Sequence, residues 1–215
     1  YAVDFRGASL EALRRMGILE EVQRHATRMG DMDYVNEKGR KVGSTPPVVF
    51  SGELEILRGD LVKILYERTR HDVEYIFDDS ITGITQDANG VNVTFLNSPA
   101  RRFDLVVGAD GVHSNVRSLA FGAEEQYAHN LGLYVSVGTV PNHLGLDRKG
   151  RFFNTPGRLA GMYPARGNTE AKAMFYFKSE QLDYGRRDVT RQKDLLTEAF
   201  AGAGWEVPTL VDAIR

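Results

Sequence analysis

One stretch of the chain, residues 103–117 with the sequence FDLVVGADGVHSNVR, constrains the fold more than any other. Residues 105–107 are consecutive apolar residues, which predicts a strand that is covered on both faces, as in a parallel sheet. Gly108 ends this run, and Ser114 is well placed to cap a short helix. We therefore expect a buried strand, a tight turn and the start of a helix.

The expected turn suits the sugar and phosphates of a nucleotide. Gly108 and Gly111 let the backbone approach a ligand without a Cβ in the way. Amide groups at a helix start favour an anion, and Arg117 adds a positive charge one turn into the helix. Asp110 can accept hydrogen bonds from a ribose or order the turn. An ordinary strand–turn–helix connection explains the spacing equally well, because no P-loop or GxGxxG accompanies it.

The composition excludes several classes of function. The net charge of −2 over 215 residues gives no attraction to nucleic acid or to an anionic membrane. The absence of cysteine removes disulfides, thiolate nucleophiles and cysteine-ligated metals. The histidines show no metal-ligand spacing, and no serine-hydrolase elbow is present. No apolar run approaches the roughly 18–20 residues of a membrane span. We expect a cytoplasmic protein that binds small molecules and no metal.

The first half of the chain mixes helical and strand patterns. Apolar residues at three-residue steps predict a helix over residues 8–26, broken near Gly17. Two strands are expected around a turn at residues 37–40, then a helix capped by Asp60 and an alternating strand at residues 91–95.

The pattern changes after about residue 121. Residues 133–137 and 171–177 alternate in polarity, which predicts antiparallel strands that are half buried on one face. Residues 190–200 form an amphipathic pattern typical of a helix. We therefore expect two closely packed structural units that meet near residues 121–130.

Three segments share the pattern of one known family. Residues 104–117 closely resemble the DG motif of the para-hydroxybenzoate-hydroxylase-like flavoprotein monooxygenases, which are FAD-dependent aromatic hydroxylases. Residues 3–18 look like the segment after that family's second strand, and residues 56–65 resemble its R-x-x-L-x-x-x-L helix start. The three occur in the family's order at roughly its spacing. The resemblance covers residues 1 to about 121 well and rests mainly on strand pattern after that.

The resemblance implies an α/β architecture. Residues 1–122 would be part of an FAD/NAD(P)-binding domain of the glutathione-reductase-like kind, and residues 123–215 an antiparallel β-sheet substrate domain with terminal helices. Within the first, residues 31–57 and 74–100 are candidates to pack with the substrate sheet. The family's GxGxxG and GD motifs are expected outside the chain. We therefore expect an incomplete FAD-binding domain, cut short at both ends and inactive alone.

The resemblance also implies which residues hold the cofactor. The arginine at the position of Arg58 contacts the flavin cofactor in this family, and the start of a helix is a favourable place for a diphosphate. The alternative is a surface arginine in a salt bridge with Asp60 or Glu55. The implied cofactor-binding residues are Arg6, Arg58, Asp110, Gly111 and Arg117, although Arg117 can instead pin the turn to the sheet.

The later sheet is expected to be the substrate platform, with a mostly apolar pocket and a few polar anchors. The strand pattern offers six candidates, for each of which plain packing is the alternative: Tyr134, Ser136, Arg158, Met162, Phe175 and Phe177. Arg158, Tyr134 and Phe175 are the preferred three. No catalytic side chain is expected, because the flavin supplies the chemistry.

The implied function is FAD-dependent monooxygenation. NAD(P)H as co-substrate would reduce FAD, and molecular oxygen would then hydroxylate a small aromatic or polyketide-like substrate through a flavin C4a-hydroperoxide. Two alternatives stay open. One is a flavoprotein of the same fold that reduces a double bond or epoxidises an isoprenoid, and the other is a non-catalytic binding fragment that lacks flavin.

Overall fold

The computed structural model describes residues 1–185 and 187–215, which fall into two units. The first unit combines residues 1–69 with residues 132–215, and the second unit is residues 70–131. Each unit contains its own sheet. The expected boundary at residue 122 therefore does not coincide with the ends of these compact units.

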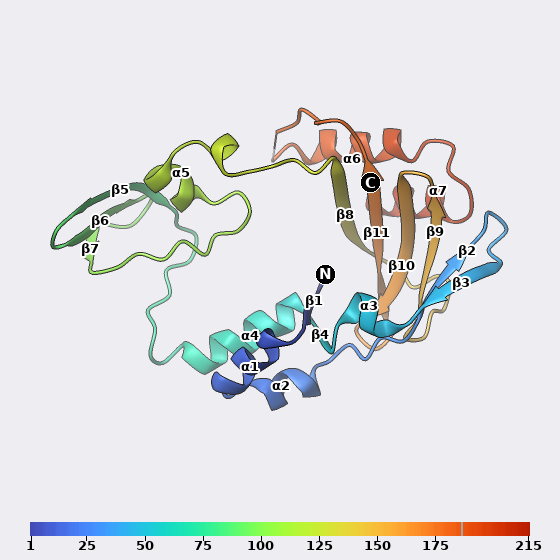
Figure 1. Ribbon diagram of the computed structural model, residues 1–215, viewed down its shortest axis with the longest axis horizontal. Coiled ribbons are helices and arrows are strands. Elements are labelled where there is room, and N and C mark those ends of the chain that lie inside the picture. Colours follow the sequence, from blue (N-terminus) through green and yellow to red (C-terminus); the bar gives the residue numbers. More distant parts are fainter. Residues whose placement is uncertain (186) are drawn as a thin grey trace. The chain divides into compact units, whose positions relative to one another are not determined.

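A six-stranded sheet forms the larger part of the first unit (Figure 1). All its neighbouring strands are antiparallel except β2 and β9, which are parallel. The expected strands at residues 133–137 and 171–177 are confirmed, and the pair at the 37–40 turn joins the same sheet. In spatial order the strands are β3 (Lys41–Thr45), β2 (Met32–Val35), β9 (Gly150–Thr155), β10 (Arg158–Ala165), β11 (Glu170–Lys178) and β8 (Leu133–Val140).

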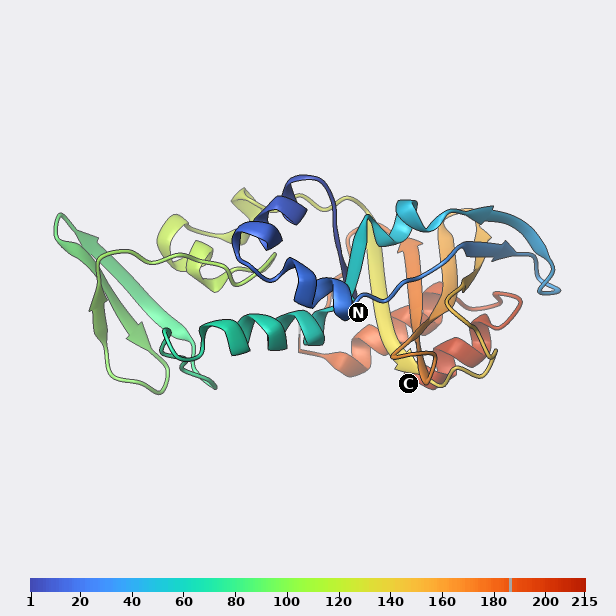
Figure 2. The ribbon, with the colours of Figure 1, turned by 90° about the horizontal axis from the view of Figure 1, so that it is seen from below.

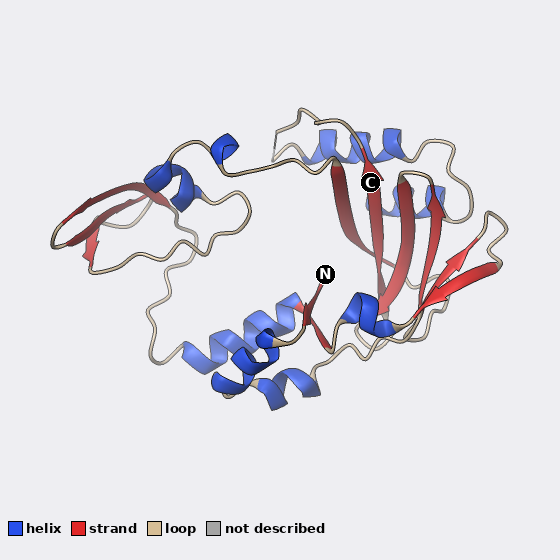
Figure 3. Ribbon diagram, in the orientation of Figure 1, coloured by secondary structure: helices blue, strands red, loops and turns tan. Residues whose placement is uncertain are grey.

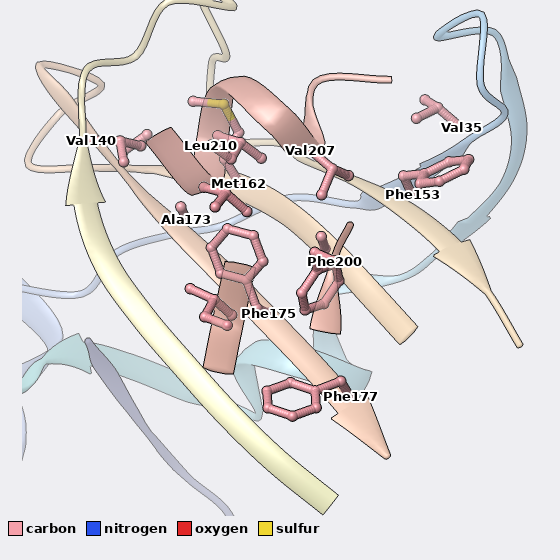
Figure 4. Packing of buried hydrophobic residues seen from close by; sticks show 14 of the residues in the cluster. Val35, Val140, Phe153, Met162, Ala173, Phe175, Phe177, Phe200, Val207 and Leu210 are labelled. Carbon is pink, nitrogen blue, oxygen red and sulfur yellow. The ribbon is translucent and has the colours of Figure 1, made fainter. Parts of the chain in front are cut away.

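Two helices, α6 (Val189–Ala199) and α7 (Val207–Ile214), cover one face of this sheet (Figure 2). The face is apolar because alternate residues of β11 point toward it, and Phe175 and Phe177 are among them. Figure 4 shows both rings beside Phe200, and the Phe175 and Phe200 rings meet edge to face with their centroids 5.1 Å apart. The amphipathic helix expected at residues 190–200 is thus confirmed, and its apolar stripe completes the core.

Strand β8 buries its aromatic residue and leaves two aliphatic residues exposed. Tyr134 is the register partner of Phe177, so it shares the helix-covered face, and the two rings stack at 5.5 Å. Leu133 and Val135 point the other way and are 50% and 54% exposed. Because Tyr134 stacks on Phe177 of β11, the side of β8 that carries Tyr134 packs toward the helices.

The rest of the first unit consists of a short strand pair with helices. Strand β1 (Ala2–Phe5) pairs with β4 (Leu54–Leu57). The helix break expected near Gly17 is confirmed, because Gly17 has a φ of +69° between two helices. These helices pack on β4 through Leu13, Val22 and Ile56. The helices of this part are α1 (Ala8–Arg15), α2 (Leu19–Arg24), α3 (Pro47–Ser51) and α4 (Arg58–Thr69).

The prediction that Asp60 caps α4 is wrong. The helix begins at Arg58, directly after β4 ends at Leu57, so Asp60 lies in its first turn instead of preceding it. An acidic residue in the first turn still complements the helix dipole. The consequence is that Arg58 itself occupies the helix start.

The second unit is a three-stranded antiparallel sheet with one short helix. The sheet contains β5 (Ile81–Asp87), β6 (Gly90–Phe95) and β7 (Arg101–Phe103). The alternating strand expected at residues 91–95 is confirmed as part of β6. A short helix, α5 (Asn115–Phe121), and a 3-10 turn (Glu124–Gln126) follow. Residues 74–100 thus contribute strands to this sheet and not to the six-stranded one.

The prediction of a buried strand at residues 103–107 is wrong. Strand β7 ends at Phe103, and the chain continues as a loop (Figure 3). Leu105 and Val107 are 75% and 76% exposed. A strand needs a neighbour that accepts its backbone hydrogen bonds, and a strand covered on both faces needs layers above and below it. No strand among the described residues pairs with this segment.

We expect Phe175→Ala to destabilise the first unit strongly. The side chain is fully buried against Phe200, and a phenylalanine-to-alanine change in a core costs about 3–5 kcal/mol through lost burial and a residual cavity. Urea unfolding followed by the fluorescence of Trp205, which packs against the same core, measures the change.

Val135→Ala is the matched control, because Val135 lies exposed in the adjacent strand. Its effect should stay within about 0.5 kcal/mol. Similar losses in the two variants would show that the core is not organised around Phe175.

Candidate functional site

Arg58 presents a positive charge without an acidic partner at the start of α4. Its Nη1 donates to the Tyr1 hydroxyl at 2.8 Å, and its guanidinium lies 5.3 Å from the centre of the Tyr1 ring. No ion pair of Arg58 occurs among the described residues. The proposed salt bridges with Asp60 and Glu55 do not form, since Glu55 accepts from Thr27 and Asp60 lies 4.0 Å from Arg166. The guanidinium is exposed and open to an anionic ligand.

Arg6 is more fully engaged. Its Nε donates to the Asp4 carboxylate at 2.6 Å, and its Nη2 donates to the Val49 carbonyl at 2.9 Å. The contact with Val49 fastens the segment before α1 to α3, and the contact with Asp4 is local to β1. An anionic ligand at Arg6 would compete with Asp4.

Asp110 organises the turn that leads into α5. One carboxylate oxygen accepts from the Ser114 hydroxyl at 2.5 Å, and the other accepts from the amides of Asn115 and Val116 at 2.6 and 3.0 Å. The Ser114 hydrogen bond, followed by that from Val116, holds the pKa of this carboxyl below its usual value. Ser114 in turn accepts from the Arg117 amide, which confirms the expected helix cap. The carboxylate is thus already committed to the protein backbone.

Gly111 and Arg117 complete this turn. Gly111 has a φ of +90°, a conformation that favours glycine, and nothing lies within 4 Å of where its Cβ would be. Arg117 donates from Nη2 to the Val112 carbonyl at 2.8 Å and faces Glu124 at 3.4 Å. Its side chain therefore pins the turn, as the alternative interpretation of the sequence holds. The open space beside Gly111 leaves backbone accessible to a ligand.

The three preferred substrate candidates lie on the helix-covered face of the large sheet. Phe175 is fully buried in the core. Arg158 donates to the carbonyls of Ala199 and Ala201, where it satisfies the end of α6. The Tyr134 hydroxyl accepts from the Leu182 amide at 2.8 Å. These contacts account for the three side chains by packing and capping, and they do not favour contact with a substrate.

The remaining candidates share this face. Met162 is fully buried beside Phe175, and Ser136 and Phe177 line a cavity of about 100 Å³ together with Tyr134. A space of that size holds a few water molecules and no aromatic substrate. No candidate from the strand pattern therefore lines a cavity of substrate size.

The opposite face of the sheet is buried at β9 and β10, where Phe152 and Tyr163 pack with Met29 and Met32, and exposed at β8. Val137, Met174, Gly161 and Phe152 are successive register partners across β8, β11, β10 and β9, and all belong to that face. No helix corresponding to α6 or α7 packs over its β8 edge in the part of the chain that the structure describes, where Leu133 and Val135 are exposed. The candidates from the strand pattern all lie on the helix-covered face and none on this one.

Comparison with known proteins identifies the family. Residues 2–206 match the sequence model of a family described as FAD binding domain. The chain belongs to this family. Membership confirms the resemblance inferred from the three segments, the α/β FAD-binding fold with an antiparallel sheet, and FAD as the cofactor of the fold.

Curated relatives extend over the whole chain. A Mycobacterium tuberculosis protein named only as uncharacterized is 43% identical over 220 residues, which cover all of this chain and 59% of that protein. A flavin-dependent monooxygenase of Legionella longbeachae is 34% identical over 98% of this chain and 55% of its own length. The chain thus spans less than two thirds of the length of these relatives.

Solved structures agree with the sequence relatives. The crystal structure of tetracycline destructase Tet(55) covers the entire chain with a TM-score of 0.86 and 34% identity, and the chain covers 55% of it. A salicylate hydroxylase substrate complex shares the fold, with a TM-score of 0.68 at 18% identity. None of the described helices is long and apolar enough to cross a membrane.

We expect Asp110→Asn to weaken the turn and to flatten its response to acid. An amide nitrogen cannot accept the hydrogen bonds that one carboxylate oxygen accepts now, and a lost cap costs about 0.5–2 kcal/mol. Because the folded-state pKa of Asp110 is lowered, its stabilisation is present above the ordinary value of 3.8 and is lost as the pH falls further. Thermal unfolding of wild type and variant between neutral pH and pH 3 measures both effects. Parallel pH profiles in the two proteins would contradict this role.

Proposed function

We propose that the protein containing this chain is an FAD-dependent monooxygenase. It uses NAD(P)H and molecular oxygen to hydroxylate an aromatic or polyketide-like small molecule. The observation that carries the proposal is the likeness of the entire chain to tetracycline destructase Tet(55), at a sequence identity that exceeds what a shared fold alone requires. The relatives named flavin-dependent monooxygenases support the same reaction class.

The residues of the first unit fit an FAD diphosphate. Arg58 supplies an exposed guanidinium that is free of any described ion pair, and it stands at the start of a helix, where amide groups favour an anion. Tyr1 orients the guanidinium through its hydroxyl. Arg6 is a second candidate for contact with the cofactor, once Asp4 is displaced or shared.

The Asp110 turn, taken within the second unit alone, also has features that suit a nucleotide ligand. Its carboxylate fixes the loop, and the open space at Gly111 admits a ligand close to the backbone. Arg117 acts on the ligand only through the turn that it pins. Asp110 and Arg117 are therefore positioning residues in this proposal.

FAD, when bound, supplies the hydride acceptance and oxygen activation. The chain's own contribution to the reaction is placement and exclusion of water. The exposed β8 edge of the face opposite the helices, with Leu133 and Val135, is suited to both tasks, because an aromatic or polyketide-like ring system buries apolar area against it. The sheet is attached to the helices on its other face by Arg158, Tyr134 and Phe175.

We expect Arg58→Ala to weaken FAD binding about ten- to a hundredfold. Removal of one charge-assisted contact costs roughly 1.5–3 kcal/mol. Titration of flavin fluorescence in the whole protein measures the affinity. Arg68→Ala, at the other end of the same helix, is the matched control and should bind FAD normally. An unchanged affinity for Arg58→Ala would leave this arginine a purely structural partner of Tyr1.

The reaction itself is tested with isotopically labelled oxygen. A polycyclic aromatic substrate of the tetracycline type should accelerate NAD(P)H oxidation by the FAD-loaded protein, and one labelled oxygen atom should enter the product. Substrate-stimulated oxidation without incorporation would favour a reductase of the same fold, and incorporation into an isoprenoid alone would favour an epoxidase. A purified protein without flavin absorbance would favour the binding fragment.

A further inference from the structure

A second cavity of the first unit is lined by none of the residues assigned above, although it borders the start of α4. Its volume is about 460 Å³. It is bounded by the end of α2, the start of α4 and the turns that flank β9, β10 and β11. Its lining residues include three arginines, two aspartates and an apolar wall: Arg28, Arg148, Arg166, Asp60, Asp147, Met29, Leu57 and Pro164.

The three arginines share an unusual backbone. Arg28, Arg148 and Arg166 have φ values of +51°, +49° and +48°, in the left-handed region that side chains other than glycine, asparagine and aspartate rarely adopt. Each such residue costs on the order of 1 kcal/mol or more and persists only where its surroundings enforce it. The turns alone do not explain why three arginines occupy such positions around one cavity, because glycine could adopt each conformation at no steric cost.

Hydrogen bonds between the loops enforce these conformations. The Gly30 amide donates to the Arg148 carbonyl, which joins the segment after α2 to the turn before β9. The Asn168 side chain accepts from the Arg148 amide at 3.3 Å and donates to the Asp147 carboxylate at 2.8 Å. The hairpin tip between β10 and β11 is thereby fixed to the same turn. Hydrogen bonds between the loops therefore hold the cavity wall together, and no single loop determines its shape.

The charges of the lining are only partly compensated. Arg28 has no ion pair or hydrogen bond among the described residues. Arg148 faces only its neighbour Asp147, at 3.4 Å. Arg166 pairs with Glu170 at 3.3 Å and lies 4.0 Å from Asp60. With Glu170 counted, the carboxylates equal the arginines in number, but Arg28 keeps a guanidinium without an acidic partner among the described residues, and Asp60 can still accept from hydroxyl or amino groups.

We propose that this cavity binds a phosphorylated nucleoside. The phosphate would be held by Arg28 with Arg148 or Arg166, because guanidinium groups suit phosphate oxygens. The sugar hydroxyls and the exocyclic amine would donate to Asp60 and Asp147. The base would cover the apolar wall around Met29. A bare inorganic anion would bring no donor to Asp60, whose one described partner is Arg166 at 4.0 Å, so the mixed lining favours a nucleotide.

The adenosine phosphate end of NAD(P)H belongs to this chemical class. Its assignment to the cavity rests on the proposed function, in which NAD(P)H is the reductant. The binding of an adenosine phosphate as such does not depend on that function. Two probes, ADP and NADPH, separate the free nucleotide from the reductant.

Calorimetric titration of the FAD-loaded protein with ADP, NADPH and inorganic phosphate tests the inference. The variant is Arg28→Asn, because asparagine accepts a left-handed backbone and the loop should therefore fold. Arg15→Asn, on the surface of α1, is the matched control. We expect Arg28→Asn to weaken ADP and NADPH about tenfold and the control to leave both affinities unchanged. ADP should displace NADPH in competition.

The outcomes distinguish the two proposals. Normal ADP and NADPH affinity in both Arg28→Asn and Arg166→Lys, or binding of inorganic phosphate as tight as that of ADP, overturns the nucleotide site. If NADPH reduces the bound flavin in wild type and its KM is unchanged in these variants, the reductant binds elsewhere; the proposed function then survives, and the cavity remains a nucleotide site only if Arg28→Asn weakens ADP. If ADP binds in an Arg28-dependent way but no reductant reduces the flavin, the site survives and the proposed function fails.

Discussion

The burial of alternate residues of β10 and β11 beneath α6 and α7 determines the rest of the first unit. Phe175, Phe177 and Met162 point into this layer, and the hydrophobic effect gives each of them a large preference for it. Because side chains alternate along a strand, the same choice places Met174 and Gly161 on the opposite face. One face therefore packs against the helices, and the other packs against Met29 and Met32 at β9 and β10 and is exposed only toward β8. Neighbouring residues along a strand therefore contribute to different faces of the sheet.

The parts of the fold that local periodicity determines could be predicted from the sequence. The strands at residues 91–95 and 171–177, the helix at residues 190–200 and the break at Gly17 each depend on neighbours within a few positions. The failures depend on distant partners. Residues 105–107 are apolar enough for a buried strand, but no described strand accepts their backbone hydrogen bonds. The orientation of Tyr134 depends on Phe177, which is far along the chain.

In the candidate site too, features that depend on nearby residues could be predicted, and features that depend on distant residues could not. The motif around Asp110 could be found because its hydrogen bonds join residues at most six positions apart. Arg58 could be found only by resemblance, since nothing local distinguishes an exposed arginine at a helix start from any other. The substrate candidates stay predictions, because size and aromaticity are shared by core residues and binding residues alike. The register of β8, β11 and β10 is needed to tell which face of the sheet each candidate belongs to.

The left-handed arginines set local backbone stability against side-chain chemistry. Glycine or asparagine at a position with a positive φ relieves strain without loss of the turn. Arg28, Arg148 and Arg166 instead place a guanidinium group at such positions, beside the cavity. The charge of the cavity therefore comes with a strained backbone. Substitution by glycine at these positions would then make a sturdier protein with a poorer cavity.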